Sequence, residues 1–515
     1  MKKTFLLILV IVHSLATVYA QNVNTTIFTI FTTAGCGCTG SGGAPLTFTT
    51  HEEVIDQLQA ATTGIEFLVW QGSRQAAVEE LESNRENYDG VIIIGEIDFG
   101  DFGIAFTGLP TIFVHNLWEF MTSPYNLFLT GKIPEGSILA GGDDQRYRNR
   151  KILTAQLDRR NVCSPEVKES MFNDLVDKIK LIRVVKEVKG TRILMLTADK
   201  NDVIARVNYR GDISQQFPDD HNDRYVKNLK ELFDIDIVRV GGEEFYEAFK
   251  NADVGQAVQI ADKWIRGARK VTASRDEIVK SARAYLATDA LRIKYDCNAV
   301  STHLRSVTGS GELKDRFNPG IGMELGFKPR GIMGVCQNYP DLLVAQVLAY
   351  ALTGRPSMMG DFIYDIDNGV EIILHCGIPV NPFGGDNMIP YSIVPHAESP
   401  VRDIPERPGS STGLTAEWPQ GEPVTIWEIH SLHREIRLHT GKIVDGHAIY
   451  TGGENIDDVM CTAKIFARVD AKKLRDNHFF PSKYGIHTNA TLGDLRKQLT
   501  DISVFLGIAV NDSDI

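Results

Sequence analysis

Short apolar runs that alternate with helical stretches place the strongest constraint on what this chain can fold into. The run Gly-Val-Ile-Ile-Ile-Gly at Gly90–Gly95 is typical of a strand buried on both faces of a parallel sheet. A helical pattern lies nearby, at Ser73–Asn84. Further runs of the strand type lie at Ile27–Thr32, Glu66–Trp70 and Leu109–His115. This alternation predicts a doubly wound α/β domain over residues 21–188.

A second α/β unit is expected to begin near Gly190, after a charged helix rich in Lys. The strand pattern returns at Thr191–Thr197 and Ile235–Val240, and one long helical segment is predicted from Val254 to Ala287. Shorter helices are predicted at Asn222–Phe233 and Glu243–Asn251. Together these elements predict a second doubly wound α/β domain over residues 189–330.

The pattern changes from about residue 330, where one apolar helix is followed by β-rich segments and Pro- and Gly-rich loops. A final helix is predicted at Leu492–Leu506. The strands are predicted at Gly369–His375, Pro423–Leu438, Lys442–Tyr450 and Ala463–Val469. This order predicts a β-rich C-terminal domain over residues 331–515, either barrel-like or a sandwich.

The start of the C-terminal domain carries the most informative stretch of the chain. A loop at Val335–Pro340 precedes a mostly apolar run from Asp341, which Gly354 and Pro356 bring to an end. A buried helix is therefore expected here, followed by a turn at the edge of a strand that presents Asp361.

The first 20 residues have the pattern of a secretory signal peptide. Lys2 and Lys3 precede an apolar run from Phe5 to Val12, and a small residue, Ala20, ends the segment. The run is too short to span a membrane, and no later segment reaches a spanning length without charge. We therefore expect cleavage after Ala20 and an exported protein, periplasmic or secreted, with no membrane span.

Composition excludes several classes of protein. The 515 residues suggest two to four domains, and the net charge of −12 comes without a basic stripe, so nucleic acid is not an expected partner. The seven cysteines are scattered and odd in number, which does not fit a disulfide-stapled scaffold. Cys36 and Cys38 lie in a glycine-rich loop. Their spacing fits two free thiols, and it also fits two ligands of a metal site.

The stretch from Cys336 to Asp361 resembles the catalytic domain of the L-fucose isomerase and L-arabinose isomerase superfamily. In that family a Cys-Glu-Gly-Asp loop, a buried helix, a Thr-Gly-x-Pro turn and a Gly-Asp follow in the same order and at the same spacing. The resemblance extends from about Cys297 to Leu506, and upstream of Cys297 it follows the order of the domains. It implies a C-terminal domain of the fucose/arabinose isomerase type and a homo-oligomer, a trimer or a hexamer.

The resemblance also implies a site. The family holds a divalent metal, Mn or Mg, with the loop Glu, the Asp after the helix and a C-terminal His. The matching positions here are Gln337, Asp361 and His487. In the family the Glu and the Asp also move the proton of an aldose–ketose isomerisation. The resemblance therefore assigns Asp361 and Gln337 the catalytic positions. The alternatives are that Asp361 caps a turn and that His487 is structural.

Gln337 departs from the family pattern in a way that changes the chemistry. A Gln carbonyl binds a metal more weakly than a carboxylate, and its amide does not serve as a base near neutral pH. The second acidic position of the loop is also lost, as Tyr339. The nearby carboxylates that could replace the missing acid are Asp341, Asp365 and Glu324.

Three further residues are candidates for binding a sugar. His375, in His375-Cys376-Gly377, and His396 resemble family histidines, although a packed strand end also explains the first. Trp427 can stack on a sugar ring or pack in a core. His430, His433 and His439 suggest a metal cluster, but in a strand His430 lies on the face opposite to the other two.

Two functions fit these observations. The first is an exported sugar-acting enzyme, either a metal-dependent aldose–ketose isomerase or a derived carbohydrate-active enzyme acting on a sugar or glycoside. The second is a carbohydrate-binding protein that retains the pocket but has weakened catalysis. Metal content and turnover distinguish the two.

The signal peptide can be tested directly. We expect the exported chain to begin at Gln21, because a small residue at position 20 ends the apolar segment. Intact-mass spectrometry of protein recovered from the secreted or periplasmic fraction measures this, with the cytoplasmic precursor as the control. An exported chain that retains Met1 would contradict the prediction.

Overall fold

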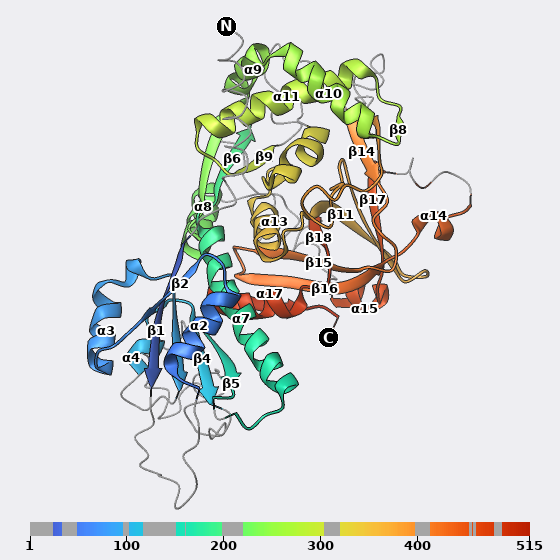
Figure 1. Cartoon of the computed structure of the whole chain (residues 1–515). Coiled ribbons are helices and arrows are strands. Elements are labelled where there is room, and N and C mark those ends of the chain that lie inside the picture. Colours follow the sequence, from blue (N-terminus) through green and yellow to red (C-terminus); the bar gives the residue numbers. More distant parts are fainter. Residues whose placement is uncertain are drawn as a thin grey trace, which may run out of the picture. The chain divides into compact units, whose positions relative to one another are not determined.

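A computed structural model describes residues 24–32, 49–95, 102–116, 151–159, 161–197, 220–302, 320–396, 412–452, 456, 460–477 and 487–514 (Figure 1). The chain divides into two compact units. Unit 1 comprises residues up to Glu187 together with Gln498–Ala509, and unit 2 comprises Val188–Lys497 and Val510–Ile515. The predicted signal peptide, Cys36 and Cys38 lie outside the described residues.

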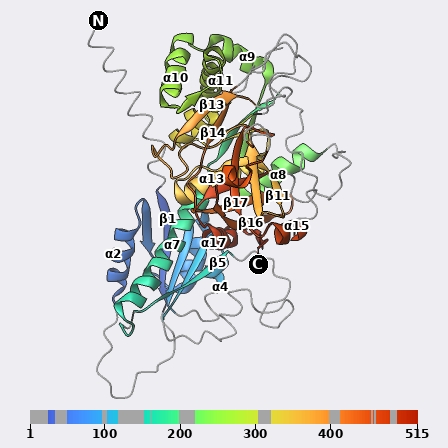
Figure 2. The ribbon, with the colours of Figure 1, turned by 90° about the vertical axis from the view of Figure 1, so that its right-hand side faces the viewer.

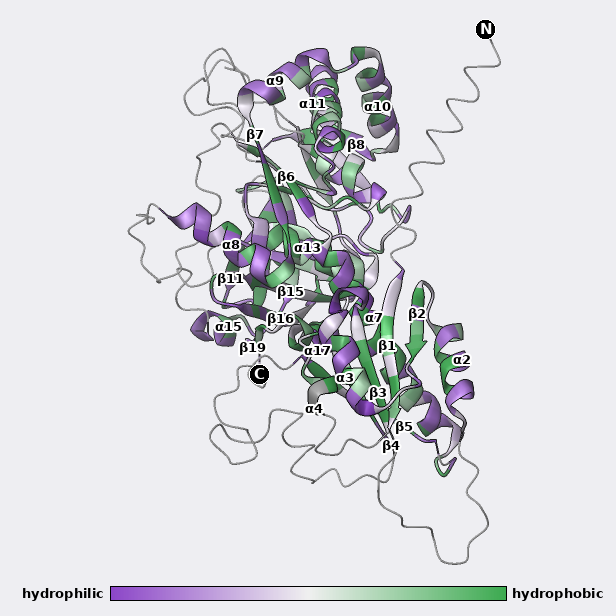
Figure 3. Ribbon diagram, turned by 90° about the vertical axis from the view of Figure 1, so that its left-hand side faces the viewer, coloured by the Kyte–Doolittle hydropathy of each residue, from purple (hydrophilic) through white to green (hydrophobic). Residues whose placement is uncertain are grey.

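Unit 1 is built on a five-stranded sheet in the order β2-β1-β3-β4-β5, and every neighbouring pair is parallel. In Figure 3 its strands are mostly hydrophobic, while α2 and α3 are largely hydrophilic on their outer sides. The strands are β1 (Thr25–Thr32), β2 (Ile65–Val69), β3 (Gly90–Gly95), β4 (Thr111–Asn116) and β5 (Ile152–Leu157). The helices are α2 (His51–Ala61), α3 (Arg74–Ser83), α4 (Phe102–Ala105) and α7 (Pro165–Lys189), with a short 3-10 turn, η1 (Arg85–Asn87). The predicted α/β character is confirmed here.

Local sequence explains where these elements begin. All six residues of β3 are buried, as expected for the interior of a parallel sheet. The side chain of Ser73 accepts a hydrogen bond from the Ala76 amide and caps α3. Thr50 and Glu53 form a capping box at the start of α2.

Unit 2 contains a second parallel sheet, in the order β10-β9-β6-β7. Its strands are β6 (Arg192–Thr197), β7 (Asp236–Gly241), β9 (Ala299–Thr302) and β10 (Gly334–Cys336). The helices of this region are α8 (His221–Phe233), α9 (Gly242–Asn251), α10 (Val254–Gly267) and α11 (Arg275–Lys294). Because β10 comes from beyond residue 330, this sheet joins residues that the sequence assigned to two separate domains.

The single helix predicted at Val254–Ala287 is wrong, because the structure breaks it into α10 and α11. Between them, β8 (Lys270–Val271) pairs with β13 (Tyr391–Pro395), which in turn pairs with β14 (Thr412–Ala416). Ser274 then caps α11 by accepting from the Glu277 amide. Figure 2 shows β13 and β14 next to α10 and α11, and buried residues of these elements form one core.

The β-rich region of unit 2 is a closed ring of six strands, in the order β15-β18-β11-β12-β17-β16 and back to β15. Each neighbouring pair in the ring is antiparallel. Its strands are β11 (Met358–Asp365), β12 (Val370–His375), β15 (Pro423–His430), β16 (Glu435–Ile443), β17 (Ala463–Arg468) and β18 (His487–Leu492). β19 (Ala509–Asp512) neighbours β16 in this sheet. The predicted β-rich region is confirmed.

Three predictions for the C-terminal part of the chain need correction. Pro423–Leu438 is a hairpin of β15 and β16, because residues 431–434 form a turn. Only the start of Lys442–Tyr450 is strand, and Asp445 then caps the short helix α14 (Gly446–Ile449). The final helix, α17 (Arg496–Leu506), begins later than predicted because Leu492 is the last residue of β18. A further short helix, α15 (Ala471–Asn477), lies before β18.

Helix α13 (Pro340–Thr353) forms as the sequence predicts. It contacts β9 and β10 of the parallel sheet as well as β15 and β18 of the ring (Figure 1), which explains why it is apolar on most sides. Gly354 ends the helix with a φ of 68°, and its amide donates to the Tyr350 carbonyl. Among the described residues, no helix is both long and apolar enough to cross a membrane.

Gly354 provides a test of this helix end. We expect Gly354→Ala to lower the free energy of unfolding by about 1 kcal/mol, because L-residues with a Cβ are disfavoured in the left-handed region. A Cβ added at Gly354 or at Gly452 would meet no atom within 4 Å, and only Gly354 has a positive φ. Gly452→Ala is therefore the matched control. Equal denaturation midpoints for the two variants would contradict the prediction.

Candidate functional site

Asp361 and His487 face each other across two neighbouring strands of the ring. The antiparallel register of β11 and β18 puts the two residues opposite each other, and His487 Nε2 lies 3.3 Å from Asp361 Oδ1. The His487 side chain is 6% exposed and the Asp361 side chain 28%. Two residues that the family resemblance selected are therefore in direct contact, and Asp361 lies within a strand instead of the expected turn.

Two aromatic rings flank His487. The ring of His375, at the end of β12, has its centroid 5.7 Å from that of His487, and the ring of Tyr339 lies at 4.6 Å. Burial lowers the pKa of His375 well below its ordinary value, and the nearby His487, His396 and Lys328 lower it further. His375 is therefore neutral near pH 7.

His396 follows β13 and is buried, 2% exposed. Its electrostatic effect on His375 places it in the same neighbourhood. The structure therefore brings together Asp361, His487, His375 and His396, which come from four separate segments of unit 2.

Gln337 lies between β10 and α13 in an unusual backbone conformation, with a φ of 114°. The backbone N–H of Gln337 donates to the backbone carbonyl of Thr302. The backbone carbonyl of Gln337 accepts from Ser301 Oγ at 3.3 Å and from the Tyr339 backbone N–H at 2.9 Å. Such conformations persist where surrounding contacts hold them, and they concentrate at functional sites. The loop of the family resemblance is thus a constrained segment.

Trp427 lies in the core. It is fully buried on β15, and its indole N–H donates to Thr491 Oγ1 at 3.0 Å. This is the core packing that the sequence offered as the alternative to stacking on a sugar.

Of the three histidines of the β15–β16 hairpin, His430 and His433 are neighbours, whereas His439 lies farther along the hairpin beside Glu371. His439 Nε2 lies 2.5 Å from Glu371 Oε2, whereas His430 lies 3.7 Å from Glu428 and 5.5 Å, ring to ring, from His433. Within the described ranges, no group of three or more His, Cys, Asp or Glu side chains is arranged to hold a metal.

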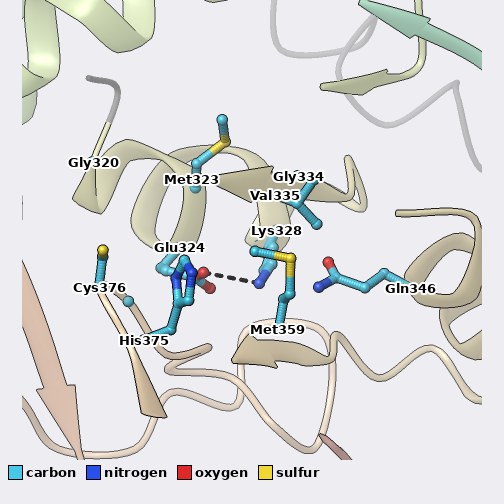
Figure 4. A pocket seen from close by; sticks show the side chains of 11 residues that line it. Gly320, Met323, Glu324, Lys328, Gly334, Val335, Gln346, Met359, His375 and Cys376 are labelled. Atoms are coloured by element: carbon cyan, nitrogen blue, oxygen red, sulfur yellow. Dashed lines mark hydrogen bonds and ion pairs between the residues drawn. The ribbon is translucent and has the colours of Figure 1, made fainter. Parts of the chain in front are cut away.

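A small pocket of about 20 Å³ lies beside His375 (Figure 4). The residues that line it come from β10 and the segment before it, from α13, from β11, and from the end of β12 and the two residues after it. Those with functional side chains are Glu324, Lys328, Gln346, Met359, His375 and Cys376. The volume is enough for about one water-sized group.

Glu324 and Lys328 form a buried ion pair at this pocket. Lys328 Nζ donates to Glu324 Oε1 at 2.9 Å and to the Ser357 carbonyl at 2.8 Å. Burial raises the pKa of Glu324 and lowers that of Lys328, and in each case the charge of the partner opposes the shift. Perturbed acid–base groups in a pocket are typical of functional sites. Lys328 and Gln346 are functional candidates that only the structure reveals, although Glu324 and Lys328 have the i, i+4 spacing of a helical ion pair.

The structure separates the three carboxylates that could replace the acid lost at Gln337. Asp341 accepts from the Ser431 amide at 3.3 Å, and burial raises its pKa. Asp365 accepts from the Tyr450 hydroxyl at 2.7 Å. Of the three, Glu324 alone lines the pocket.

The donor set can be compared with the needs of Mn or Mg. These hard cations prefer several oxygen ligands, with carboxylates as the strongest. Asp361 would supply one carboxylate and His487 one imidazole nitrogen, and a Gln337 amide would add a neutral oxygen. This set is poorer in charge than the family set, so tight binding of a divalent ion is not expected from these residues alone.

No family model matches this chain, and no curated protein matches it.

The metal prediction can be tested at Gln337. We expect Gln337→Glu to tighten Mn²⁺ binding by about fivefold or more, because one added charge contributes about 1–4 kcal/mol of attraction. Isothermal calorimetry measures the dissociation constant. Gln71→Glu adds the same charge at an exposed position of unit 1 and is the control. Unchanged Mn²⁺ affinity in a folded Gln337→Glu protein would contradict the assignment of this loop.

Proposed function

We propose that this chain is an exported sugar-acting enzyme of the L-fucose/L-arabinose isomerase-like fold. Its reaction moves a proton between adjacent carbons of an aldose or a related sugar, and Mn or Mg assists where it is bound. The observation that carries the proposal is the contact between Asp361 and His487 beside a pocket that holds further acid–base side chains.

The chemistry of the site supports this reaction class. Exchange between an aldose and a ketose requires groups that take and return protons at two neighbouring carbons and their oxygens. His375, neutral near pH 7, lies between the Asp361–His487 pair and the pocket, since it contacts His487 and also lines the pocket. A metal, when bound, would polarise the sugar carbonyl. Asp361 and His487 are the residues that would hold it.

The second candidate is a carbohydrate-binding protein with weakened catalysis. Gln337 favours it, because an amide at this position neither titrates near neutral pH nor binds a divalent ion strongly. Such a protein binds sugars without converting them. Turnover therefore separates the two functions. The predicted trimer or hexamer is compatible with either of them.

The proposal predicts that the protein incorporates deuterium from D₂O into an aldose at the carbon next to the carbonyl. Proton NMR of a panel of pentoses, hexoses and their deoxy forms measures this exchange. We expect Asp361→Asn to slow it by about 100-fold or more, because the substitution removes a carboxylate from the reacting groups.

Asp367→Asn is the matched control, since Asp367 is an exposed Asp beyond the end of the same strand. Exchange that persists in a folded Asp361→Asn protein would remove Asp361 from the site. Sugar binding without exchange in the wild type would favour the binding protein.

A further inference from the structure

The pocket beside His375 contains two buried oxygens that accept no hydrogen bond from any residue the structure describes. They are Glu324 Oε2 and Gln346 Oε1. Glu324 is 7% exposed and Gln346 is fully buried, so bulk water does not satisfy these atoms. A buried acceptor without a donor is costly, so these two oxygens need a group that donates hydrogen bonds, either a water or a ligand hydroxyl.

The other atoms of these two side chains are fixed. Gln346 Nε2 donates to Asn489 Oδ1 at 3.0 Å, which orients the amide and leaves its oxygen as the acceptor. Glu324 Oε1 accepts from Lys328, which leaves Oε2 as the second carboxylate oxygen. In Figure 4 the Glu324 carboxylate and the Gln346 amide approach Lys328 from opposite sides.

Two unusual helical turns carry Glu324 and Lys328 at the pocket. Glu324 lies in a π-helical turn, η4 (Met323–Phe327), which continues into the 3-10 turn η5 (Lys328–Arg330). Turns of the π type often occur at functional sites. A Cβ built on Gly377 would lie 3.1 Å from Glu324 Cγ, so a glycine at this position leaves room for the side chain.

We propose that Glu324 is the general base of this site, with Lys328 as its acid partner, in place of the carboxylate that the family loop has at the position of Gln337. This inference rests on the proposed function and names the residues that move the proton. The part of the sugar that enters the pocket is one hydroxyl, because the space holds about one water, and the carbon atoms next to it lie at the edge of the pocket.

The proton transfers balance without an external oxidant or reductant. Glu324 takes the proton from C2 of an open-chain aldose while the Lys328 ammonium gives a proton to the O1 carbonyl, which forms a neutral enediol. The O2 hydroxyl then returns a proton to the Lys328 amine, and the Glu324 carboxylic acid delivers its proton to C1. The product is the ketose, and both side chains regain their starting charges. The raised pKa of Glu324 and the lowered pKa of Lys328 suit these transfers.

The test measures deuterium incorporation into aldoses by the full-length mature protein and three variants. Glu324→Gln removes the base at nearly constant shape, and we expect exchange to fall by about 100-fold or more. Because Glu324→Gln leaves Lys328 as an unpaired buried charge, the second variant is the double substitution Glu324→Gln with Lys328→Met, which removes both charges. It should lose exchange to the same extent.

Glu371→Gln is the matched control, because Glu371 is an equally buried Glu that contacts His439 and does not line the pocket. It should retain exchange. Far-ultraviolet circular dichroism and calorimetric binding of unreactive pentitols and hexitols are measured in parallel. Loss of exchange in both Glu324 variants, with a folded protein and with exchange retained in Glu371→Gln, supports the proposal.

The two proposals fail in different ways. If the wild type exchanges deuterium and either folded Glu324 variant stays within threefold of it, Glu324 is not the base and the proposed function stands. If the wild type binds the alditols but exchanges no aldose, the enzyme function and the base role are both overturned. The carbohydrate-binding function then remains.

Discussion

The ammonium group of Lys328 joins the parts of unit 2 on which the candidate site depends. It holds the Glu324 carboxylate on one side and the carbonyl of Ser357 on the other, and Ser357 immediately precedes β11. The turns η4 and η5 are thereby tied to the strand that carries Asp361. Since Lys328 is 1% exposed, its charge is tolerated only because these oxygens surround it.

Helix α13 also connects the parts of unit 2, through apolar contacts. It packs against both the parallel sheet and the ring, and Gln346 on this helix donates to Asn489 of β18. The loop before the helix, with Gln337 in a strained conformation, is held by hydrogen bonds to Ser301, Thr302 and Tyr339. These hydrogen bonds and apolar contacts connect the segments around the site to both the parallel sheet and the ring.

Gln337 stands where the family that this chain resembles has a carboxylate, and the arrangement of the site shows which other carboxylates are near. A proton-transfer site needs a carboxylate of suitable pKa near the reacting carbon, whichever element supplies it. Glu324 is the carboxylate that we propose for this role, because it lines the pocket beside Lys328, whereas Asp341 and Asp365 accept hydrogen bonds from Ser431 and Tyr450. An acid from a different segment can take over this role wherever it reaches the same pocket.

Several helices and strands follow from short stretches of sequence alone. The apolar run of β3, the Ser73 cap of α3 and the Gly354 end of α13 depend on neighbouring residues, so their positions agree with the predictions. The break between α10 and α11 was missed because β8 is held by pairing with the distant β13.

The contacts between polar residues of the site depend on how distant segments pair and pack. The register of β11 on β18 sets Asp361 opposite His487, and the packing of the ring buries Trp427 in the core. Of the three candidate carboxylates, Glu324 alone lines the pocket. The residues that bury each carboxylate and hydrogen-bond to it come from segments far apart in the chain. Strand pairing and desolvation are non-local, and no pattern of neighbouring residues specifies them.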